Sequence, residues 1–133
     1  MSQENVEVVQ SVLAAFSRYE ERSVLGLLDP EVVFDATRRK VNPRVYIGME
    51  GLRQILADRD EVWEVFRTEP REFIDAGDRV VVTGLWVGKG KGSGVEVQQP
   101  TVHVFTLHDG RVVRWELGHT NRSQALEAVG LRE

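Results

Sequence analysis

The second half of this chain constrains its fold most strongly, because strand-forming segments follow one another there with only short turns between them. Valine and aromatic residues dominate four segments, at residues 71–75, 79–88, 95–107 and 111–119. Gly77-Asp78 and Asp109-Gly110 separate neighbouring segments and favour tight turns, so the pattern predicts antiparallel hairpins. Strand 79–88 is apolar on both alternating faces, and we expect both faces to be covered.

The first half carries helical periodicity instead. Val6, Val9, Leu13 and Phe16 recur at steps of three and four residues, which predicts an amphipathic helix over residues 3–20. Further elements are expected as a short helix from Ser23 through Leu28, a strand over 31–36, a helix over about 49–67 closed by Pro70, and a helix over 123–129. Helices gathered on one side of a curved antiparallel sheet form an α+β architecture.

Composition narrows the class of protein. The 133 residues, 41% of them hydrophobic, suit one domain spanning 1–133. The net charge of −4 weighs against nucleic-acid binding, and the chain has no cysteine for thiol chemistry. The acidic N-terminus differs from a signal peptide, and no apolar run is long enough for a membrane span. We therefore expect a cytoplasmic protein without a membrane or nucleic-acid partner.

The register of the last hairpin decides which side chains share a face. A two-residue turn would place Glu116 opposite His103, whereas a three-residue bulged loop would place Trp115 there. Only the bulged loop pairs the two apolar sets, so we predict it. His103 and His119 would then line an apolar cavity with Trp115. The opposite face, expected to be mixed and available for a homodimer, holds Val102, Val104, Thr106, Arg114 and Glu116.

Four strings, in this order and spacing, resemble the nuclear transport factor 2-like superfamily, and within it the SnoaL-like and ketosteroid-isomerase-like proteins. The strings are LLDPEVVFD (27–35), YIGMEGL (46–52), FTLHDGRVVRW (105–115) and ALEAVGL (125–131). The resemblance covers nearly the whole chain. It implies a cone-shaped roll of the cystatin type, with helices packed on the concave side of the sheet.

The resemblance also implies site residues. Ketosteroid isomerase uses an aspartate base and an oxyanion hole of a tyrosine and a protonated aspartate. Asp35 matches the position of the base, and His103 that of the oxyanion aspartate, while Ser11 or Val12 stands where the tyrosine is expected. An apolar cavity would raise the pKa of Asp35 and suit it to proton abstraction. The alternative is a solvated carboxylate at a strand end.

Other residues have competing interpretations. His103 could donate a hydrogen bond or act as a general acid near neutral pH, or it could be a core histidine. His119 is a second candidate, with a rim position as the alternative, and His108 is expected on the surface. Aromatic side chains could line a substrate pocket or pack in the core; those expected to line it are Tyr46, Trp86, Phe105 and Trp115, with Trp63 assigned to the core.

Two loops have an unusual composition, one basic and one rich in glycine. Arg38, Arg39, Lys40 and Arg44 could attract an acidic substrate, although a solvated loop is the more common role. The glycine-rich segment 88–94 lacks the following helix that a phosphate-binding loop requires, so we predict a hairpin loop. No ligand spacing for a metal is visible, and no cofactor is expected.

These features favour a cofactor-free enzyme that performs isomerisation, cyclisation or a related proton transfer on a small, largely apolar molecule. Asp35 would be the base, and His103, with His119, would hold or protonate an oxygen. The alternative is a noncatalytic module that binds a small ligand or a partner, and a hydrolase or dehydratase is a third possibility. We expect a homodimer, because Val81, Leu85 and Val87 form a second apolar face on strand 79–88.

Overall fold

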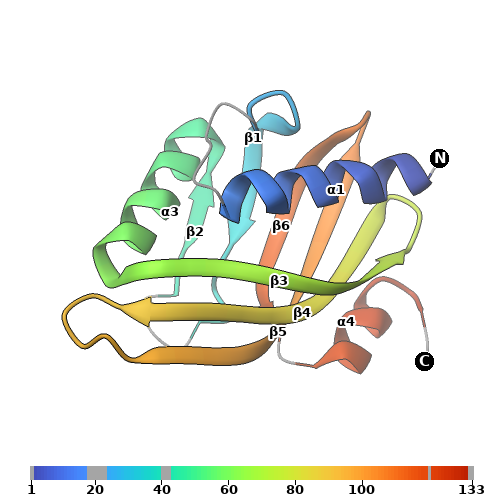
Figure 1. Ribbon diagram of the computed structural model, residues 1–133. Coiled ribbons are helices and arrows are strands. Elements are labelled where there is room, and N and C mark those ends of the chain that lie inside the picture. The colour runs from blue at the N-terminus through green and yellow to red at the C-terminus, as the bar shows by residue number, and fades with distance from the viewer. Residues whose placement is uncertain (1, 18–23, 40–42, 120, 132–133) are drawn as a thin grey trace.

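The computed structural model describes residues 2–17, 24–39, 43–119 and 121–131, which form a curved six-stranded sheet with helices on both faces (Figure 1). The elements are α1 (Ser2–Ser17), β1 (Leu28–Asp35), β2 (Val45–Ile47), α3 (Gly48–Val62), β3 (Trp63–Asp75), β4 (Arg79–Gly90), β5 (Glu96–His108), β6 (Arg111–His119) and α4 (Arg122–Ala128). The strand order is β2-β1-β6-β5-β4-β3. The α+β prediction is confirmed, but the sheet is mixed, because β1 runs parallel to β6.

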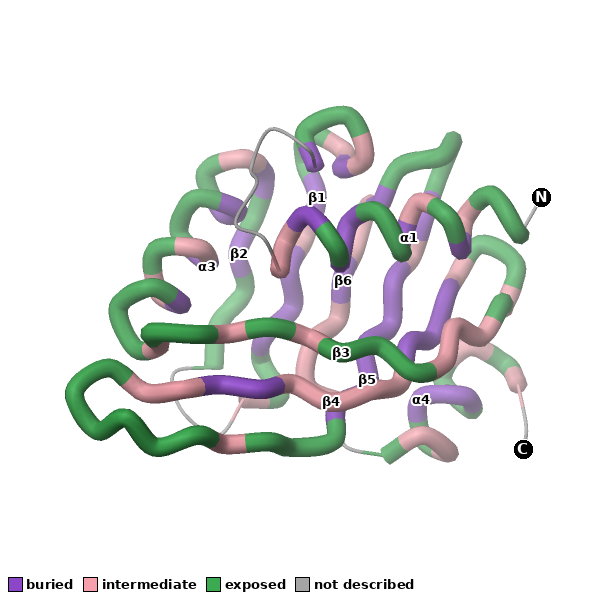
Figure 2. Tube along the Cα trace, in the orientation of Figure 1, coloured by how far each residue is buried: buried purple, intermediate pink, exposed green. Residues whose placement is uncertain are grey.

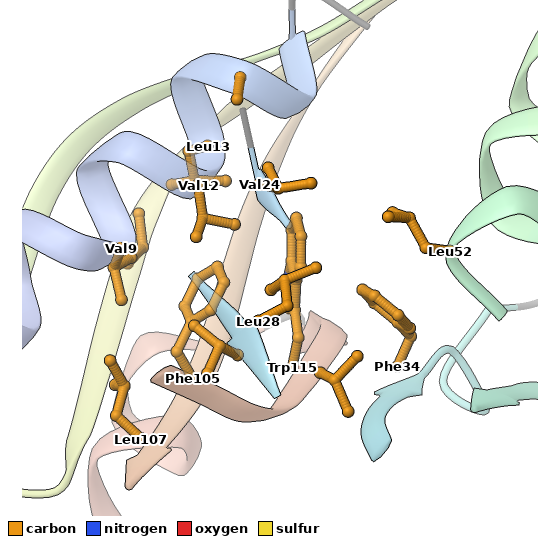
Figure 3. Close-up of a cluster of buried hydrophobic side chains, with 14 of the residues drawn as sticks. Val9, Val12, Leu13, Val24, Leu28, Phe34, Leu52, Phe105, Leu107 and Trp115 are labelled. Carbon is orange, nitrogen blue, oxygen red and sulfur yellow. The ribbon is translucent and has the colours of Figure 1, made fainter. Parts of the chain in front are cut away.

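Two hydrophobic clusters define the two faces of the sheet. On the core side, α1 and α3 pack against strand residues that include Phe34, Phe105 and Trp115 (Figure 3). On the outer side, α4 packs Ala125 and Leu126 against β4 and β5. Buried residues are concentrated in the middle of the sheet, along β1, β5 and β6 (Figure 2).

The expected dimer surface is partly occupied by the chain itself. Val81 is fully buried on the outer side, and α4 covers it together with Val102 and Val104. The expectation that both faces of β4 are covered is confirmed here, but the cover on the outer side is α4 of the same chain, which was predicted to lie with the other helices. The homodimer stays a prediction.

The boundary between α3 and β3 differs from the expected one. We predicted a helix to residue 67 and a strand only from 71, but α3 ends at Val62 and β3 begins at Trp63. Aromatic and β-branched residues at 63, 65 and 66 favour a strand, and pairing with β4 satisfies their backbone. Pro70 is tolerated because β3 is an edge strand with a register shift between Pro70 and Glu72.

The last hairpin has a two-residue turn, not the predicted three-residue loop. His108 pairs with Arg111, and both Asp109 (φ 50°) and Gly110 (φ 77°) have the positive φ that such a turn requires. A register shift between Thr106 and Leu107 then corrects the alignment, so the bulge lies within the strands. Trp115 consequently pairs with Phe105 and not with His103.

A short helix was predicted from Ser23 through Leu28, and Ser23 lies outside the described residues. Residues 25–27 form a turn, and Leu28 is the first residue of β1. Among the residues that are described, no helix has the length and apolar character needed to cross a membrane.

Candidate functional site

His103 lies on the core side of β5, inside an aromatic shell. Its ring centroid is 5.8 Å from that of Trp115 and 6.2 Å from that of Phe105. Only 6% of the residue is exposed. Figure 3 shows Phe105 directed toward Val12 of α1 and Trp115 directed toward Val24, so the shell is part of the main core. The prediction that His103, Phe105 and Trp115 share a face is confirmed, although the hairpin that joins their strands has a different register. The prediction that His119 shares this face was wrong, because a shift in register pairs His119 with Val102 and places it on the outer side beside Glu116.

The hydrogen bond of His103 fixes its tautomer. Trp115 Nε1 lies 3.1 Å from His103 Nδ1. Because an indole nitrogen can only donate, Nδ1 must accept and therefore carries no proton. The proton of the neutral ring is then on Nε2, which is buried and has no hydrogen-bond partner in the described structure. His103 thus presents one unsatisfied N–H donor within an apolar environment.

Burial also sets the charge of this ring. Desolvation, with a smaller contribution from the charge of His119, lowers the pKa of His103 to about 4. The ring is therefore neutral at pH 7. It can donate a hydrogen bond from Nε2, but it does not supply an imidazolium as a general acid near neutral pH.

Asp35 has a different environment, at the end of β1. One carboxylate oxygen accepts from Thr37 N at 3.0 Å and from Thr37 Oγ1 at 2.5 Å. The other lies 2.6 Å from Arg114 Nη2 and 3.3 Å from Arg38 Nη1. Burial alone would raise the pKa of Asp35, but the hydrogen bonds from Thr37 and the charges of Arg38 and Arg114 hold it below its usual range. The predicted upward shift was wrong, because the carboxylate sits in an ion-pair network and not in an apolar cavity.

Glu116 and His119 complete this network. Glu116 Oε1 lies 3.1 Å from Arg38 Nη2 and 3.1 Å from His119 Nε2, and Arg114 Nε is 3.6 Å from the other oxygen. His119 is half-buried and pairs with Val102, one residue from the strand position of His103. We call the set Asp35, Arg38, Arg114, Glu116 and His119 the charged cluster.

The strand register places Asp35 and His103 on opposite faces of the sheet. Asp35 pairs with Glu116, and Glu116 pairs with Val104, so all three point to the outer side. His103 is adjacent to Val104 and points to the core side. The structure therefore does not bring together the two residues that were predicted to act on one molecule.

Arg114, Glu116 and Thr37 were not among the predicted site residues. A sequence signal for two of them existed, since Arg114 and Glu116 flank the apolar Trp115 and must face away from the core. The pairing of these residues with Asp35 could not be foreseen, because it depends on the parallel contact of β1 with β6.

The basic loop is engaged in contacts with acidic and aromatic groups. Arg44 Nη1 lies 3.3 Å from Asp58, and its guanidinium is 4.9 Å from the ring of Tyr46. Tyr46, which is buried, donates from Oη to Asp58 at 2.6 Å and accepts from Arg39 at 3.2 Å. Burial and the hydrogen bond to Asp58 raise the pKa of Tyr46. Lys40 lies outside the described residues.

Trp86 lies on the core side of β4, further along the sheet than His103. The register pairs Val82 with His103 and Trp86 with Gln99, so both β4 residues point to the same face. Trp86 stacks on Phe66 with a centroid separation of 5.5 Å and meets Trp63 edge-on at 5.4 Å. Trp63 is thus part of this cluster, not of the main core to which it was assigned.

A surface depression of about 690 Å³ lies where the first turn of α1 meets two hairpin turns. Its walls include Glu4, Asp78 and Asp109. None of the predicted site residues lines it, and its acidic exposed walls do not match the apolar surroundings of His103.

Known proteins similar to this chain share its architecture. Residues 9–115 match the SnoaL-like domain family. TerC, crystallised with polyporic acid, is 26% identical with a TM-score of 0.77, over 95% of this chain and 98% of that chain. An NTF2-like protein of unknown function from Burkholderia pseudomallei is 24% identical over 96% and 98% of the two chains, with a TM-score of 0.77.

A protein provisionally assigned as a SnoaL-like polyketide cyclase, from Jannaschia sp. CCS1, is 21% identical over 87% of this chain and 85% of its own, with a TM-score of 0.75. No curated protein sequence is significantly similar. The family match covers most of the strands and two of the helices described above. This chain therefore belongs to the SnoaL-like domain family of the NTF2-like superfamily.

Proposed function

We propose that this protein binds a small, largely apolar molecule on the core side of its sheet, with His103 Nε2–H donating to an oxygen of that molecule. The observation that carries the proposal is the buried donor without a partner in the described structure. A buried unsatisfied donor costs about 1–3 kcal/mol, and a ligand oxygen would remove that penalty. Phe105 and Trp115 would supply the apolar wall around the oxygen.

The chemistry of this donor suits the stabilisation of the enolate oxygen that forms when a base from the solvent takes a proton from the carbon next to a carbonyl group. A neutral N–H in dry surroundings stabilises an enolate oxygen more than a neutral carbonyl oxygen, because hydrogen bonds to charged acceptors are stronger. Isomerisation and cyclisation both pass through such an oxygen. The likeness to TerC, crystallised with polyporic acid, and to a provisionally assigned polyketide cyclase supports this reaction class.

The role of Asp35 as the base stays a prediction, and the geometry supports a different role better. Both of its oxygens are engaged, its pKa is lowered, and it faces away from His103. We assign Asp35 to fixing the end of β1 against β6 through Arg114.

Isothermal titration calorimetry with chromone, a flat molecule with one carbonyl group, tests the binding site. We expect chromone to bind the wild-type protein and His103→Phe to weaken binding about tenfold, since one buried hydrogen bond is lost. Equal affinity of the two proteins would overturn the role of His103.

Deuterium exchange at the α-carbon of 2-tetralone, followed by NMR, separates an enzyme from a binding module. Acceleration by the wild-type protein that is lost in His103→Phe would support proton transfer. Binding of chromone without any acceleration would favour the module. Loss of exchange in Asp35→Asn, with chromone affinity retained, would restore Asp35 as the base.

A further inference from the structure

A second group of aromatic side chains lies on the core side of the sheet, away from His103. Trp63, Phe66 and Trp86 come from the beginning of β3 and from β4, and their ring centroids lie 5.4 to 6.1 Å apart. Phe66 and Trp86 are nearly parallel, with an interplanar angle of 20°. We call these three residues the aromatic platform.

Gly88 allows the platform to form. It follows Trp86 on the same face of β4, and a β-carbon at this position would lie 2.8 Å from ring atoms of both Trp63 and Trp86. Carbon atoms cannot approach so closely without displacement, so any larger residue would push the two rings apart. The glycine is thus required by the packing of the platform.

The platform is more open than the shell around His103. Trp63, Phe66 and Trp86 are each half-buried, whereas Phe105 and Trp115 are at most 2% exposed. The strands that carry the platform extend beyond the covered part of the sheet, as the exposed and intermediate stretches of β3 and β4 show in Figure 2. Rings in this position present part of their surface to an incoming molecule.

A continuous series of contacts leads from the platform to His103. The Arg59 guanidinium lies 6.0 Å from the Phe66 ring and 4.8 Å from the Phe16 ring, and Arg59 Nη1 donates to Phe16 O at 2.9 Å. Phe16 meets Trp115 edge-on at 4.8 Å, and Trp115 donates to His103. Arg59 and Phe16 therefore link the platform to Trp115, the residue that donates to His103.

The register gives the spacing between the platform and His103. Val82 pairs with His103, and Trp86 is four residues further along β4, which corresponds to about 14 Å of strand. A molecule that spans this spacing must be elongated. Its oxygen would lie at one end and a flat ring at the other.

The size of the platform argues for a small molecule and against a protein partner. An aromatic side chain buries at most about 250 Å². Three half-buried rings therefore offer well under the roughly 800 Å² per partner that a stable protein interface needs. A single flat ring stacked on Phe66 and Trp86 fits the available surface.

We propose that the aromatic platform is a second subsite, which stacks a flat conjugated ring of the same elongated ligand whose oxygen is bound by His103. The proposal rests on the proposed function and adds the class of ligand: a carbonyl compound with an aromatic ring extended away from the carbonyl group. Trp63, Phe66 and Trp86 then determine specificity for length and flatness.

Flavone and chromone form a matched pair of probes, because flavone is chromone with an additional phenyl ring. Calorimetry should show that flavone binds the wild-type protein about three- to tenfold more tightly than chromone, as expected for one stacked ring. Trp86→Leu should remove this advantage and leave chromone affinity unchanged. Gly88→Val, which displaces the rings without deleting one, should do the same, and Val95→Ala on the same hairpin should have no effect.

The outcomes separate the two proposals. Equal affinity of the wild-type protein for flavone and chromone, or an unchanged advantage in both Trp86→Leu and Gly88→Val, overturns the platform but not the His103 site. Failure of the natively folded protein to bind either probe overturns the proposed function and the platform with it. A change in sedimentation coefficient for Trp86→Leu, with unchanged probe affinity, assigns the rings to contacts between copies of the chain.

Discussion

The two faces of one short stretch of sheet, where β1, β6 and β5 lie side by side, show two ways of burying polar groups. On the core side, His103 has one hydrogen bond and one unsatisfied donor among aromatic rings. On the outer side, Asp35 has four close donors and belongs to a network of opposite charges. The carboxylate of Asp35, whose oxygens both accept hydrogen bonds, holds β1 to β6, whereas the unsatisfied donor of His103 holds no element in place and is the group that the proposed function uses.

Removing the centre of the core side should have the largest effect. Trp115 is 2% exposed and contacts the rings of Phe16, Phe34 and Phe105. Trp115→Ala should lower the free energy of unfolding by about 3–5 kcal/mol, through lost apolar burial and a cavity. Urea denaturation measures this loss, with Trp115→Phe as a milder control. A loss below about 1 kcal/mol would show that the aromatic shell is not the packed core described here.

Acid should destabilise the protein through His103. The pKa of this ring is about 4 in the folded protein and 6.5 when unperturbed, so the unfolded chain binds more protons between these values. The free energy of unfolding should therefore fall as the pH drops from 6.5 to 4, by about 3 kcal/mol from this group.

His103→Gln keeps a polar side chain without a titrating ring and serves as the comparison for this pH effect. Chemical denaturation at several pH values should show a weaker pH dependence in this variant than in the wild-type protein. Identical slopes between pH 4 and pH 6.5 would contradict the burial of His103.

Disrupting the charged cluster should have a smaller effect. Asp35→Asn removes a buried charge from beside Arg38 and Arg114 and should lower the free energy of unfolding by about 1–3 kcal/mol. Glu69→Gln is a matched control, because the Arg67–Glu69 pair is exposed and should contribute at most about 1 kcal/mol. Equal effects of the two substitutions would show that the cluster is only a surface ion pair.

The Asp35→Asn variant should also differ from the wild-type protein in its stability at lower pH. Because the pKa of Asp35 is lowered on folding, its stabilisation is complete above the unfolded value near 3.8 and is lost as the pH falls toward the folded value. The wild-type protein should therefore lose stability below about pH 4 more steeply than Asp35→Asn.

The sequence allows the core side to be predicted because its signals are local. Alternation along 101–107 places His103 with Phe105, and the stripe in α1 identifies the helix that covers them. The outer side could not be predicted in the same way. Asp35 and Arg114 are 79 positions apart, and they meet only because β1 pairs with β6 in parallel.

One local error and one unpredicted detail have physical causes as well. The end of α3 was misplaced because Trp63 and Phe66 fit a helical stripe as well as they fit a strand, and only pairing with β4 decides between them. The tautomer of His103 follows from a single contact with Trp115 and has no signature in the sequence.

The parallel pairing of β1 with β6 also has a consequence for how the chain folds. Leu28 and Asp35 contact strand residues 112 and 116, so the two strands are separated by most of the chain. Contacts of such long sequence separation form slowly, because a large loop must close before they stabilise anything. During synthesis, β1 has only β2 beside it until β6 has left the ribosome, and the local antiparallel pairs β1–β2, β3–β4 and β4–β5 are the parts that can organise first.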